Sequence, residues 1–294
     1  MKYMVITNKE RSDEMFKANE IYKRNLTNLI NSPYSTNGQK VRPKYADGTP
    51  SHTKYINNVT DTYDISKGEF PISNYRPLAW KSAIKELLWI FSDQSNDLNL
   101  LEDKYGVHYW NDWQIEDSDS ETRTIGQRYG ATIKKYDLMN KLLKGLKEEP
   151  YSRRHIMNMY QYTDFEESAG LNPCVYESIW NVRGEYLDVF INQRSSDYVT
   201  SEGVNRVQYC ALLLMVAKAI GLKPGLFTWN VCNMHLYDRH EEQVRELLSR
   251  TPVNIQPVLI LNTDKTDFYS FTVDDFELID FEAAGEQLKF ELAI

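Results

Sequence analysis

Apolar side chains recur at helical spacing in five segments of the chain. In residues 78–91, Ala83, Leu87 and Phe91 share one broad apolar stripe, which predicts a helix that packs against a sheet. Residues 203–220 are apolar on almost every side, which is typical of a helix buried all round and predicts a central helix. Start and stop signals predict further helices over residues 13–29, 130–146 and 236–248.

Strand patterns occupy the centre and the end of the chain. In residues 186–193, Leu187, Val189 and Ile191 alternate with more polar neighbours, as in a half-buried strand. Similar patterns predict strands over residues 156–159, 175–182, 227–231, 258–262 and 288–292. Helices and strands mix without strict βαβ alternation, which predicts an α+β fold. With no repeat and no Pro- or Ser-rich linker, residues 1–294 are expected to form one domain.

Composition narrows the classes of protein and of partner. The 294 residues include 34 basic and 42 acidic side chains, a net charge of −8, which argues against a surface for nucleic acid and requires that any phosphate be gripped locally. The three cysteines show no zinc-ligand spacing, so no metal or disulfide framework is expected. No segment has the apolar length of a membrane span or the pattern of a signal peptide, which predicts a cytoplasmic protein.

A cysteine and an arginine are the first candidates for chemistry. Cys174 directly follows Pro173 at the start of one predicted strand, and Arg194 ends the next. In an antiparallel pair these two ends lie side by side, and a nearby guanidinium favours the thiolate. The alternative is that Cys174 is a small buried hydrophobe. No Walker loop, dinucleotide fingerprint, nucleophile elbow or zinc-protease motif is present.

Four arginines stand out in this acidic chain: Arg42, Arg153, Arg154 and Arg194. Guanidinium forks match phosphate oxygens, so a single phosphate monoester is a candidate ligand. The alternative for each arginine is a solvated charge or a structural ion pair.

Further candidates have two interpretations each. Glu86 lies at the edge of the apolar stripe, where its carboxylate either faces a cleft or is an ordinary helix-face residue. Trp110 and Trp113 are either core residues or a wall on which a ring stacks. His235 and Tyr237 either bond a ribose hydroxyl or belong to the core.

Taken in order, these segments resemble folate-dependent thymidylate synthases with a cysteine nucleophile, over nearly the whole chain. The matching motifs are VRPKYADGT, FPISNYRPLAWKSAIKELLW, HYWNDW, IGQRYG, SRRHI, NPC, QRSSD, the isolated Asn205, HLY and the terminal LAI. The resemblance implies a mixed sheet with a buried central helix, a homodimer with sheets back to back, and reductive methylation of dUMP with 5,10-methylenetetrahydrofolate.

Site roles are implied by the same resemblance. Cys174 would be the nucleophile, Glu86 the general acid and base through water, and Tyr129 a helper in proton removal, with Arg194 and Asp197 also in the catalytic set. The residues implied around dUMP are Arg42, Arg153, Arg154, Gln193, Arg194, Ser195, Ser196, Asp197, Asn205, His235 and Tyr237. Those implied around the folate are Trp110, Trp113, Asp197 and the carboxylate of Ile294.

The implied dUMP contacts divide by the part of the nucleotide. Arg42, Arg194 and Ser195 would hold the phosphate, together with Arg153 and Arg154 from the other subunit. His235 and Tyr237 would bond the 3′-hydroxyl. Asn205 would recognise uracil, because a carboxamide accepts from N3–H and donates to O4.

The chain departs from the common family pattern in three places. Residues 198–204 read YVTSEGV where many members have Leu-Gly-Leu-Pro-Phe within the interval, Cys232-Asn233 replaces Gly-Asp, and Val175 replaces His. The first two departures support an alternative, a dUMP or dCMP hydroxymethylase of the same fold. A second alternative, a nonenzymatic RNA-binding regulator, conflicts with the acidic balance and with the intact Cys174 and Glu86.

Overall fold

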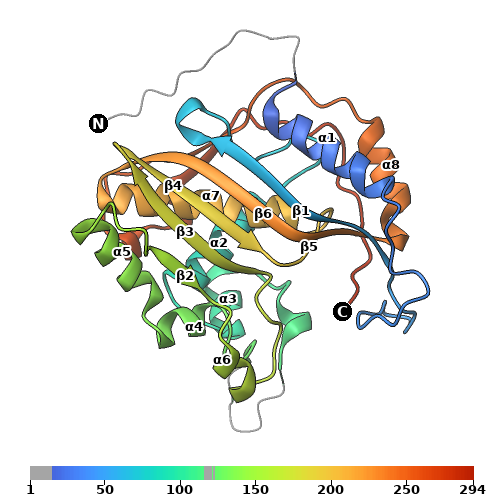
Figure 1. Cartoon of the computed structure of the whole chain (residues 1–294), viewed down its shortest axis with the longest axis horizontal. Helices are drawn as coiled ribbons and strands as arrows, with labels where there is room; N and C mark the ends of the chain where they lie inside the picture. Colours follow the sequence, from blue (N-terminus) through green and yellow to red (C-terminus); the bar gives the residue numbers. More distant parts are fainter. Residues whose placement is uncertain (1–14, 116–120, 122) are drawn as a thin grey trace.

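The computed structural model describes residues 15–115, 121 and 123–294, and a six-stranded mixed sheet forms their centre (Figure 1). The strand order is β1-β6-β4-β3-β2, and the short β5 pairs with β6. β6 is parallel to β4 and β5, whereas the other pairs are antiparallel. The strands are β1 (Thr53–Asp64), β2 (Ile156–Asn158), β3 (Val175–Arg183), β4 (Tyr186–Gln193), β5 (Ser196–Asp197) and β6 (Lys223–Tyr237).

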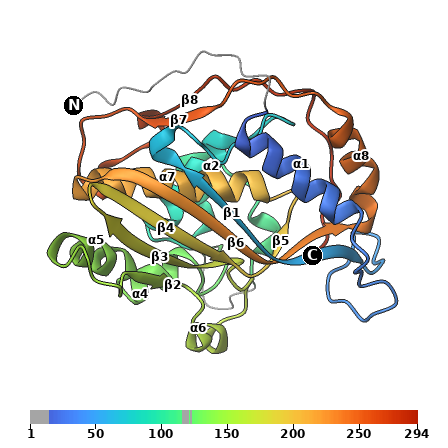
Figure 2. The ribbon, with the colours of Figure 1, turned by 45° about the horizontal axis from the view of Figure 1, so that its top comes forward.

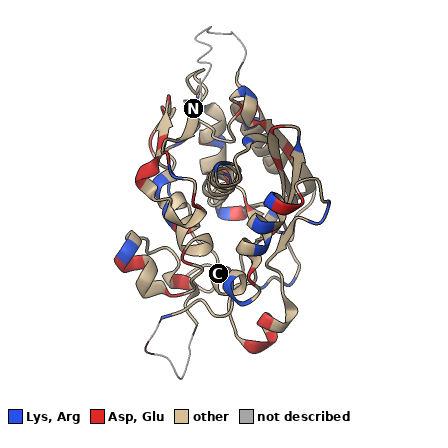
Figure 3. Cartoon of the chain, turned by 90° about the vertical axis from the view of Figure 1, so that its left-hand side faces the viewer, with Lys and Arg blue, Asp and Glu red and all other residues tan. Residues whose placement is uncertain are grey.

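Helix α7 (Glu202–Ile220) lies against the inner face of the sheet, and α2 (Trp80–Phe91) packs on α7. The inward side chains of β4 are buried, as alternation predicts, and α7 is buried over most of its circumference. Figure 3 looks along α7 in the middle of the molecule and shows acidic and basic residues interspersed on the elements around it. The predicted α+β class, mixed sheet and buried central helix are confirmed.

The other helices surround this core. α1 (Lys17–Ile30) packs on β1 and on α8 (Glu241–Ser249). The remaining helices are α3 (Leu98–Tyr105), α4 (Gly130–Lys135), α5 (Leu138–Glu148) and α6 (Tyr162–Glu167). β7 (Val258–Leu261) and β8 (Phe276–Ile279) form a separate antiparallel pair (Figure 2). Among the described residues, no helix is both long and apolar enough to cross a bilayer.

The outer face of the sheet carries a continuous row of polar side chains across five strands. Thr60 donates to Asn230 (2.8 Å), Asn230 to Asn192 (2.9 Å), and Asn192 to Glu177 (2.8 Å). Asn158 on the edge strand β2 also donates to Glu177. All of these side chains remain partly exposed, and Figure 1 views this face with α7 behind the strands. This face therefore has room for another molecule.

Two predicted helices differ from the observed ones. The segment 130–146 is two helices, α4 and α5, because Asp137 adopts a left-handed backbone (φ 52°) that ends the first. The helix predicted from residue 236 begins at Glu241, because β6 continues to Tyr237 in register with Thr53. Backbone pairing with β1 overrides the local helical pattern there.

One predicted strand is absent, and several observed strands were not predicted. Residues 288–292 form no strand, since this tail packs through scattered contacts such as that of Phe290 with His240. β1 was not predicted, because its outer face is polar and Asn58 interrupts the alternation with a left-handed backbone (φ 57°). β8 and α3 were missed as well, because four and eight residues are too few to show a clear period.

Candidate active site

The strand pairing brings Cys174 and Arg194 together as expected. Cys174 directly precedes β3 and Arg194 directly follows β4, and the Arg194 backbone N–H donates to the Cys174 carbonyl (2.8 Å). The guanidinium donates to the carbonyls of Pro173 (3.0 Å) and Asn172 (2.7 Å), and Nη2 lies 3.8 Å from Cys174 Sγ. The guanidinium is thus fixed beside the thiol by the loop that carries it.

Burial governs the protonation of this thiol. It raises the pKa of Cys174, and the positive charges of Arg194 and Arg42 offset only part of that shift. The guanidinium acts in the expected direction, but desolvation outweighs it. Any further positive charge or hydrogen-bond donor brought to the sulfur would promote the thiolate.

Glu86 faces inward from α2 and is buried. Trp110 Nε1 donates to one carboxylate oxygen (2.8 Å), and the Tyr109 hydroxyl donates to the other. Burial raises the pKa of Glu86, whereas its hydrogen bonds with Tyr109, Trp110 and Gln208 lower it. The carboxyl is therefore held in a fixed direction with a proton affinity above the ordinary, as general acid–base work requires.

Tyr129 occupies a strained backbone position at the start of α4. Its φ of 48° is uncommon for a residue with a side chain, and strain of this kind is found at functional sites. The next residue must be Gly130, because a Cβ there would collide with the Ser95 backbone. The Tyr129 hydroxyl accepts from the Cys174 backbone N–H (3.3 Å). Burial raises the pKa of this phenol, and the charges of Cys174 and Glu86 add to the rise.

Asp197, His235 and Tyr237 come together where β5 pairs with β6. Asp197 is opposite His235 in the register, and one carboxylate oxygen of Asp197 is buried without a hydrogen-bond partner in the described part of the chain. Burial lowers the pKa of His235 and raises that of Tyr237 to about 12, so both rings are neutral at pH 7. The free oxygen is a position for a donor on a ligand.

Backbone hydrogen bonds join the loop that contains Arg42 to the C-terminal residue Ile294. The backbones of Lys44 and Ile294 exchange two hydrogen bonds, of 2.8 and 3.0 Å. Arg239 reinforces this arrangement, because its Nη1 donates to both carboxylate oxygens of Glu291 (2.9 Å each). The terminal residue therefore lies next to the segment whose Arg42 acts on Cys174.

Three more of the predicted dUMP residues, Asn205, Gln193 and Ser196, differ in burial and in the hydrogen bonds of their side chains. Asn205 is half-buried on the first turns of α7. Gln193 is fully buried, and its amide accepts from Trp229 (3.1 Å) and donates to the Ser195 carbonyl (3.0 Å), so it supports the backbone of the loop. Ser196 Oγ is buried without a partner among the described residues.

Comparison with known proteins agrees with this geometry. A family model of thymidylate synthase matches residues 21–294. The chain belongs to the thymidylate synthase family. Thymidylate synthases of Streptococcus pneumoniae (strain 70585) and Streptococcus thermophilus (strain LMD-9) are 48% and 47% identical to it, each over 95% of this chain and the whole relative. The structure of thermostable thymidylate synthase A from Bacillus subtilis superposes with a TM-score of 0.86 at 35% identity, covering 95% of this chain and all of that one. The chain is accordingly a methyltransferase.

The two tryptophans of the thymidylate synthase motif HYWNDW flank the catalytic candidates. Trp110 packs edge-on against Tyr129 (5.2 Å between ring centroids) and Trp113 (5.6 Å). Trp110 is also the donor to Glu86, so it is both a core residue and part of the site, whereas Trp113 is only partly buried. The core interpretation is therefore confirmed for Trp110, and the stacking wall stays a prediction.

Arg153 and Arg154 lie apart from Cys174. They are exposed and line a hollow formed by residues 149–154, on the turn between α5 and β2. The guanidiniums that influence the Cys174 thiol are Arg194 and Arg42 of the same chain.

Sequence reasoning missed two partners in this thymidylate synthase site. Tyr109 was passed over beside Trp110, although its hydroxyl holds Glu86. Asn233 was noted only as a departure, yet its Oδ1 lies 3.1 Å from His235 Nδ1, and Asn57 on the neighbouring strand accepts from its amide. The alternation of Asn233 and His235 along one strand was the signal for this contact.

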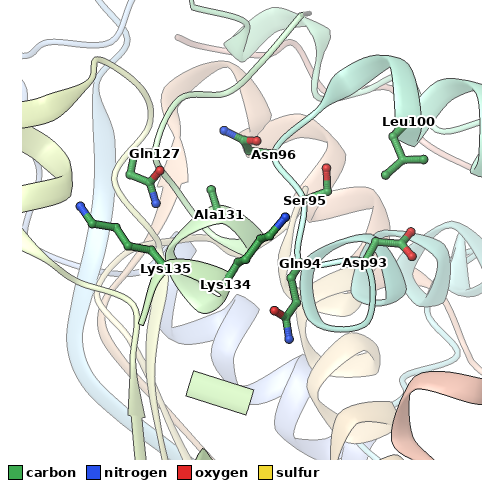
Figure 4. A pocket seen from close by; sticks show the side chains of 9 residues that line it. All are labelled: Asp93, Gln94, Ser95, Asn96, Leu100, Gln127, Ala131, Lys134 and Lys135. Carbon is green, nitrogen blue, oxygen red and sulfur yellow. The ribbon is translucent and has the colours of Figure 1, made fainter. Parts of the chain in front are cut away.

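A second hollow on the surface contains none of the predicted site residues (Figure 4). Two of its polar side chains have protein partners: Lys135 pairs with Asp164 (2.9 Å), and Asn96 donates to the Gly126 carbonyl. The amide nitrogen of Gln127 is buried without a hydrogen-bond partner among the described residues. Within the ranges described above, no cluster of side chains has the make-up of a metal site.

Proposed function

We propose that the chain converts dUMP to dTMP, with 5,10-methylenetetrahydrofolate as co-substrate. The observation that carries the proposal is the convergence of Cys174, Tyr129 and Glu86: the Tyr129 hydroxyl accepts from the Cys174 N–H, and Trp110, which packs on Tyr129, donates to Glu86. A nucleophile beside a guanidinium and a carboxyl with raised proton affinity are the groups that this reaction needs.

The cysteine begins the reaction in this proposal. The Cys174 thiolate adds to C6 of uracil, forming a C–S bond and moving the electron pair of the C5–C6 double bond into an enolate. C5 thereby becomes a carbon nucleophile. Arg194 stabilises the thiolate and, with Arg42 and Ser195, binds the phosphate through charge-assisted hydrogen bonds.

Glu86 and Tyr129, both buried, carry out the proton transfers. Glu86, held by Tyr109 and Trp110, moves protons to and from the base at O4 through water, and Tyr129 assists removal of the C5 proton. At the end, addition of the hydride to the exocyclic methylene carbon on C5 regenerates the enolate, whose electron pair restores the C5–C6 double bond, breaks the C6–S bond and frees the Cys174 thiolate. Asn205 orients uracil through its amide, and His235 and Tyr237 bond the 3′-hydroxyl.

The side chains of Asp197, Trp110 and Trp113 suit a folate. The co-substrate supplies the one-carbon unit and then the hydride. The buried oxygen of Asp197 offers an acceptor for a pterin donor, and Trp110 and Trp113 offer aromatic surface. Ile294, already paired with Lys44, helps to close the site and exclude water.

A homodimer is part of the proposal. The outer sheet face with its polar row from Thr60 to Asn158 is the surface for a second copy, and the exposed Arg153 and Arg154 are the residues donated to the partner's phosphate site. The three free cysteines suit the reducing cytoplasm, where we place the protein.

A spectrophotometric assay for dihydrofolate, formed from dUMP and methylenetetrahydrofolate, tests the proposal. Formation of dihydrofolate in step with dTMP is expected. The hydroxymethylase alternative predicts a hydroxymethyl product and no dihydrofolate, so the mass of the nucleotide product separates the two.

A further inference from the structure

A buried group of charged side chains lies beside the proposed uracil site. Arg206, in the first turns of α7, has a side chain only 1% exposed. Its Nη2 donates to Asp61 on β1 (2.7 Å), its Nε lies 2.7 Å from Glu202 one turn earlier on α7, and its Nη1 donates to the Tyr63 hydroxyl (2.6 Å). One guanidinium thus joins the helix to the sheet at two points, Asp61 and Tyr63, and also lies against Glu202 of its own helix.

The group extends to a third element and to the loop after β5. Asp61 also pairs with Arg24 of α1 and accepts from the Asn25 amide (3.1 Å). Asn25 in turn donates to the Tyr198 hydroxyl (3.2 Å), immediately after Asp197. α1, β1, α7 and the segment that follows β5 are therefore connected through Asp61 and Arg206.

The connection matters because of the residues that it carries. Asn205 is adjacent to Arg206 in sequence, and its backbone N–H donates to the Ser201 carbonyl (2.9 Å). Ser201 is bonded in turn to the Asp197 carbonyl through its N–H (3.0 Å) and its hydroxyl (2.9 Å). Neighbouring residues of a helix point about 100° apart, so Arg206 can face the sheet while Asn205 faces another side. Because both side chains are attached to the same rigid turn, a rotation of the first turn of α7 would redirect the Asn205 amide.

We propose that Arg206 is a positioning residue for base recognition, whose hydrogen bonds to Asp61 and Tyr63 of β1 fix the rotation of the first turn of α7 and thereby aim Asn205 at the base, while Glu202 of the same helix balances its charge. The inference rests on the proposed function. It also gives a role to residues 198–204, the segment in which the chain departs from the common family pattern and which contains Glu202.

Burial of the charges supports positioning over simple stabilisation. A buried ion pair gives little net stability compared with apolar residues of similar volume, because both charges lose their water. An apolar first turn could slide or rotate against the sheet at small cost, whereas Arg206 can donate to both Asp61 and Tyr63 of β1 in one orientation only.

The test compares Arg206→Met with the triple variant Asp61→Asn, Glu202→Gln, Arg206→Met. The single variant takes the buried cation away from Glu202 and leaves Asp61 with the half-exposed Arg24 as its cation, so its melting temperature falls; the triple variant removes the two carboxylates and the guanidinium together and regains most of that loss. In both we expect the KM for dUMP to rise about tenfold and the preference for dUMP over dCMP to fall, an effect that follows from misdirected hydrogen bonds. Arg206→Lys, with one nitrogen in place of a fork, should fall between wild type and Met.

Recovery of both the melting temperature and the KM in the triple variant would show that Arg206 is structural only and would overturn the inference. Leu259→Ala, a buried position on β7, is the control for lost stability, and its KM and base preference should not change. A tenfold rise in KM there would equally overturn the inference. Calorimetric titration of each protein with dUMP measures the effect without turnover, and wild-type dTMP formation tests the proposed function separately.

Discussion

At the scale of single residues, Cys174 supplies the clearest prediction. Cys174→Ser should lower turnover by about 10³-fold or more, because a serine hydroxyl is far less ionised than a thiol beside Arg194. Binding of dUMP, measured by calorimetry, should remain within a few-fold of wild type. A serine variant with near-normal turnover would rule out the covalent mechanism.

A second cysteine gives the matched control. Cys210 is fully buried in α7, and burial alone raises the pKa of its thiol. Cys210→Ala should therefore lower the melting temperature and leave kcat unchanged. A stably folded but inactive Cys210→Ala protein would contradict this division of roles.

Glu86 links catalysis to the pH dependence of stability. Burial raises the folded-state pKa of Glu86 above its ordinary 4.5, so the stability it contributes is full below pH 4.5 and is lost as pH rises through the folded pKa. Glu86→Gln cannot ionise and should gain stability relative to wild type across that rise, while kcat falls about 10²–10³-fold. Thermal melts and rates at several pH values check both. A stability difference between the two proteins that is constant with pH would contradict the raised pKa.

Asn205 decides the choice of base in the proposed reaction. Uracil presents the N3–H donor beside the O4 acceptor, whereas cytosine presents an N3 acceptor beside an amino donor. An aspartate accepts from the amino group and repels O4, so Asn205→Asp should lose dUMP methylation and gain measurable dCMP turnover, with a mismatch costing about 1–3 kcal/mol. The ratio of kcat/KM for dUMP and dCMP is the measurement. An unchanged ratio would mean that Asn205 does not contact the base.

At the scale of elements, the spacing of apolar residues predicted the helices and strands that depend on residues close together in the sequence. The strand on each side of the Cys174–Arg194 contact is read from alternation, and antiparallel pairing then brings the two residues together. The helix over residues 130–146 was wrong in one place, because nothing in the helical spacing reveals the left-handed backbone of Asp137.

Contacts between distant elements were beyond the reach of the sequence. Asp61 and Arg206 are separated by 145 positions, and Asp61 belongs to β1, the strand whose polar outer face hid it from the hydrophobic pattern. Without β1, neither the ion pair nor the Asn57–Asn233 contact behind His235 has a partner to predict. The motifs were enough to predict candidate residues such as Cys174 and Glu86, whereas the residues that orient them could be found only from the pairing of the sheet.

The C-terminal segment provides the prediction at this scale. Removal of Ile294 eliminates its two backbone bonds with Lys44, and the Arg239–Glu291 pair remains. Nucleotide binding should persist while kcat with the folate falls, because closure that excludes water is needed for the later steps. Steady-state kinetics of the truncated protein, beside calorimetry with dUMP, make the comparison. Full activity after truncation would refute a role in closure.

At the scale of the whole molecule, the two faces of the sheet differ: helices cover the inner face, whereas the outer face is partly exposed to solvent. Its inner face is closed by α7 and α2, whereas its outer face presents the polar row from Thr60 to Asn158 with partly exposed side chains. The hydrogen bonds along that row fix the side chains before any partner arrives, which lowers the entropy lost on association. A second copy on this face would give each site a phosphate ligand from the other chain.

A mixture of two inactive variants tests that shared site. Arg153→Ala retains Cys174 but lacks the donated guanidinium, and Cys174→Ser retains Arg153 but lacks the nucleophile. In a heterodimer of the two, one site draws both intact residues and the other draws neither, so random exchange should restore about one quarter of wild-type activity. Glu86→Gln mixed with Cys174→Ser is the control: both residues serve the site of their own chain, so every mixed site keeps one defect and the mixture stays inactive. Recovery in the control as well would mean that whole elements exchange between subunits, and recovery in neither, under conditions that exchange subunits, would mean that Arg153 acts within its own chain.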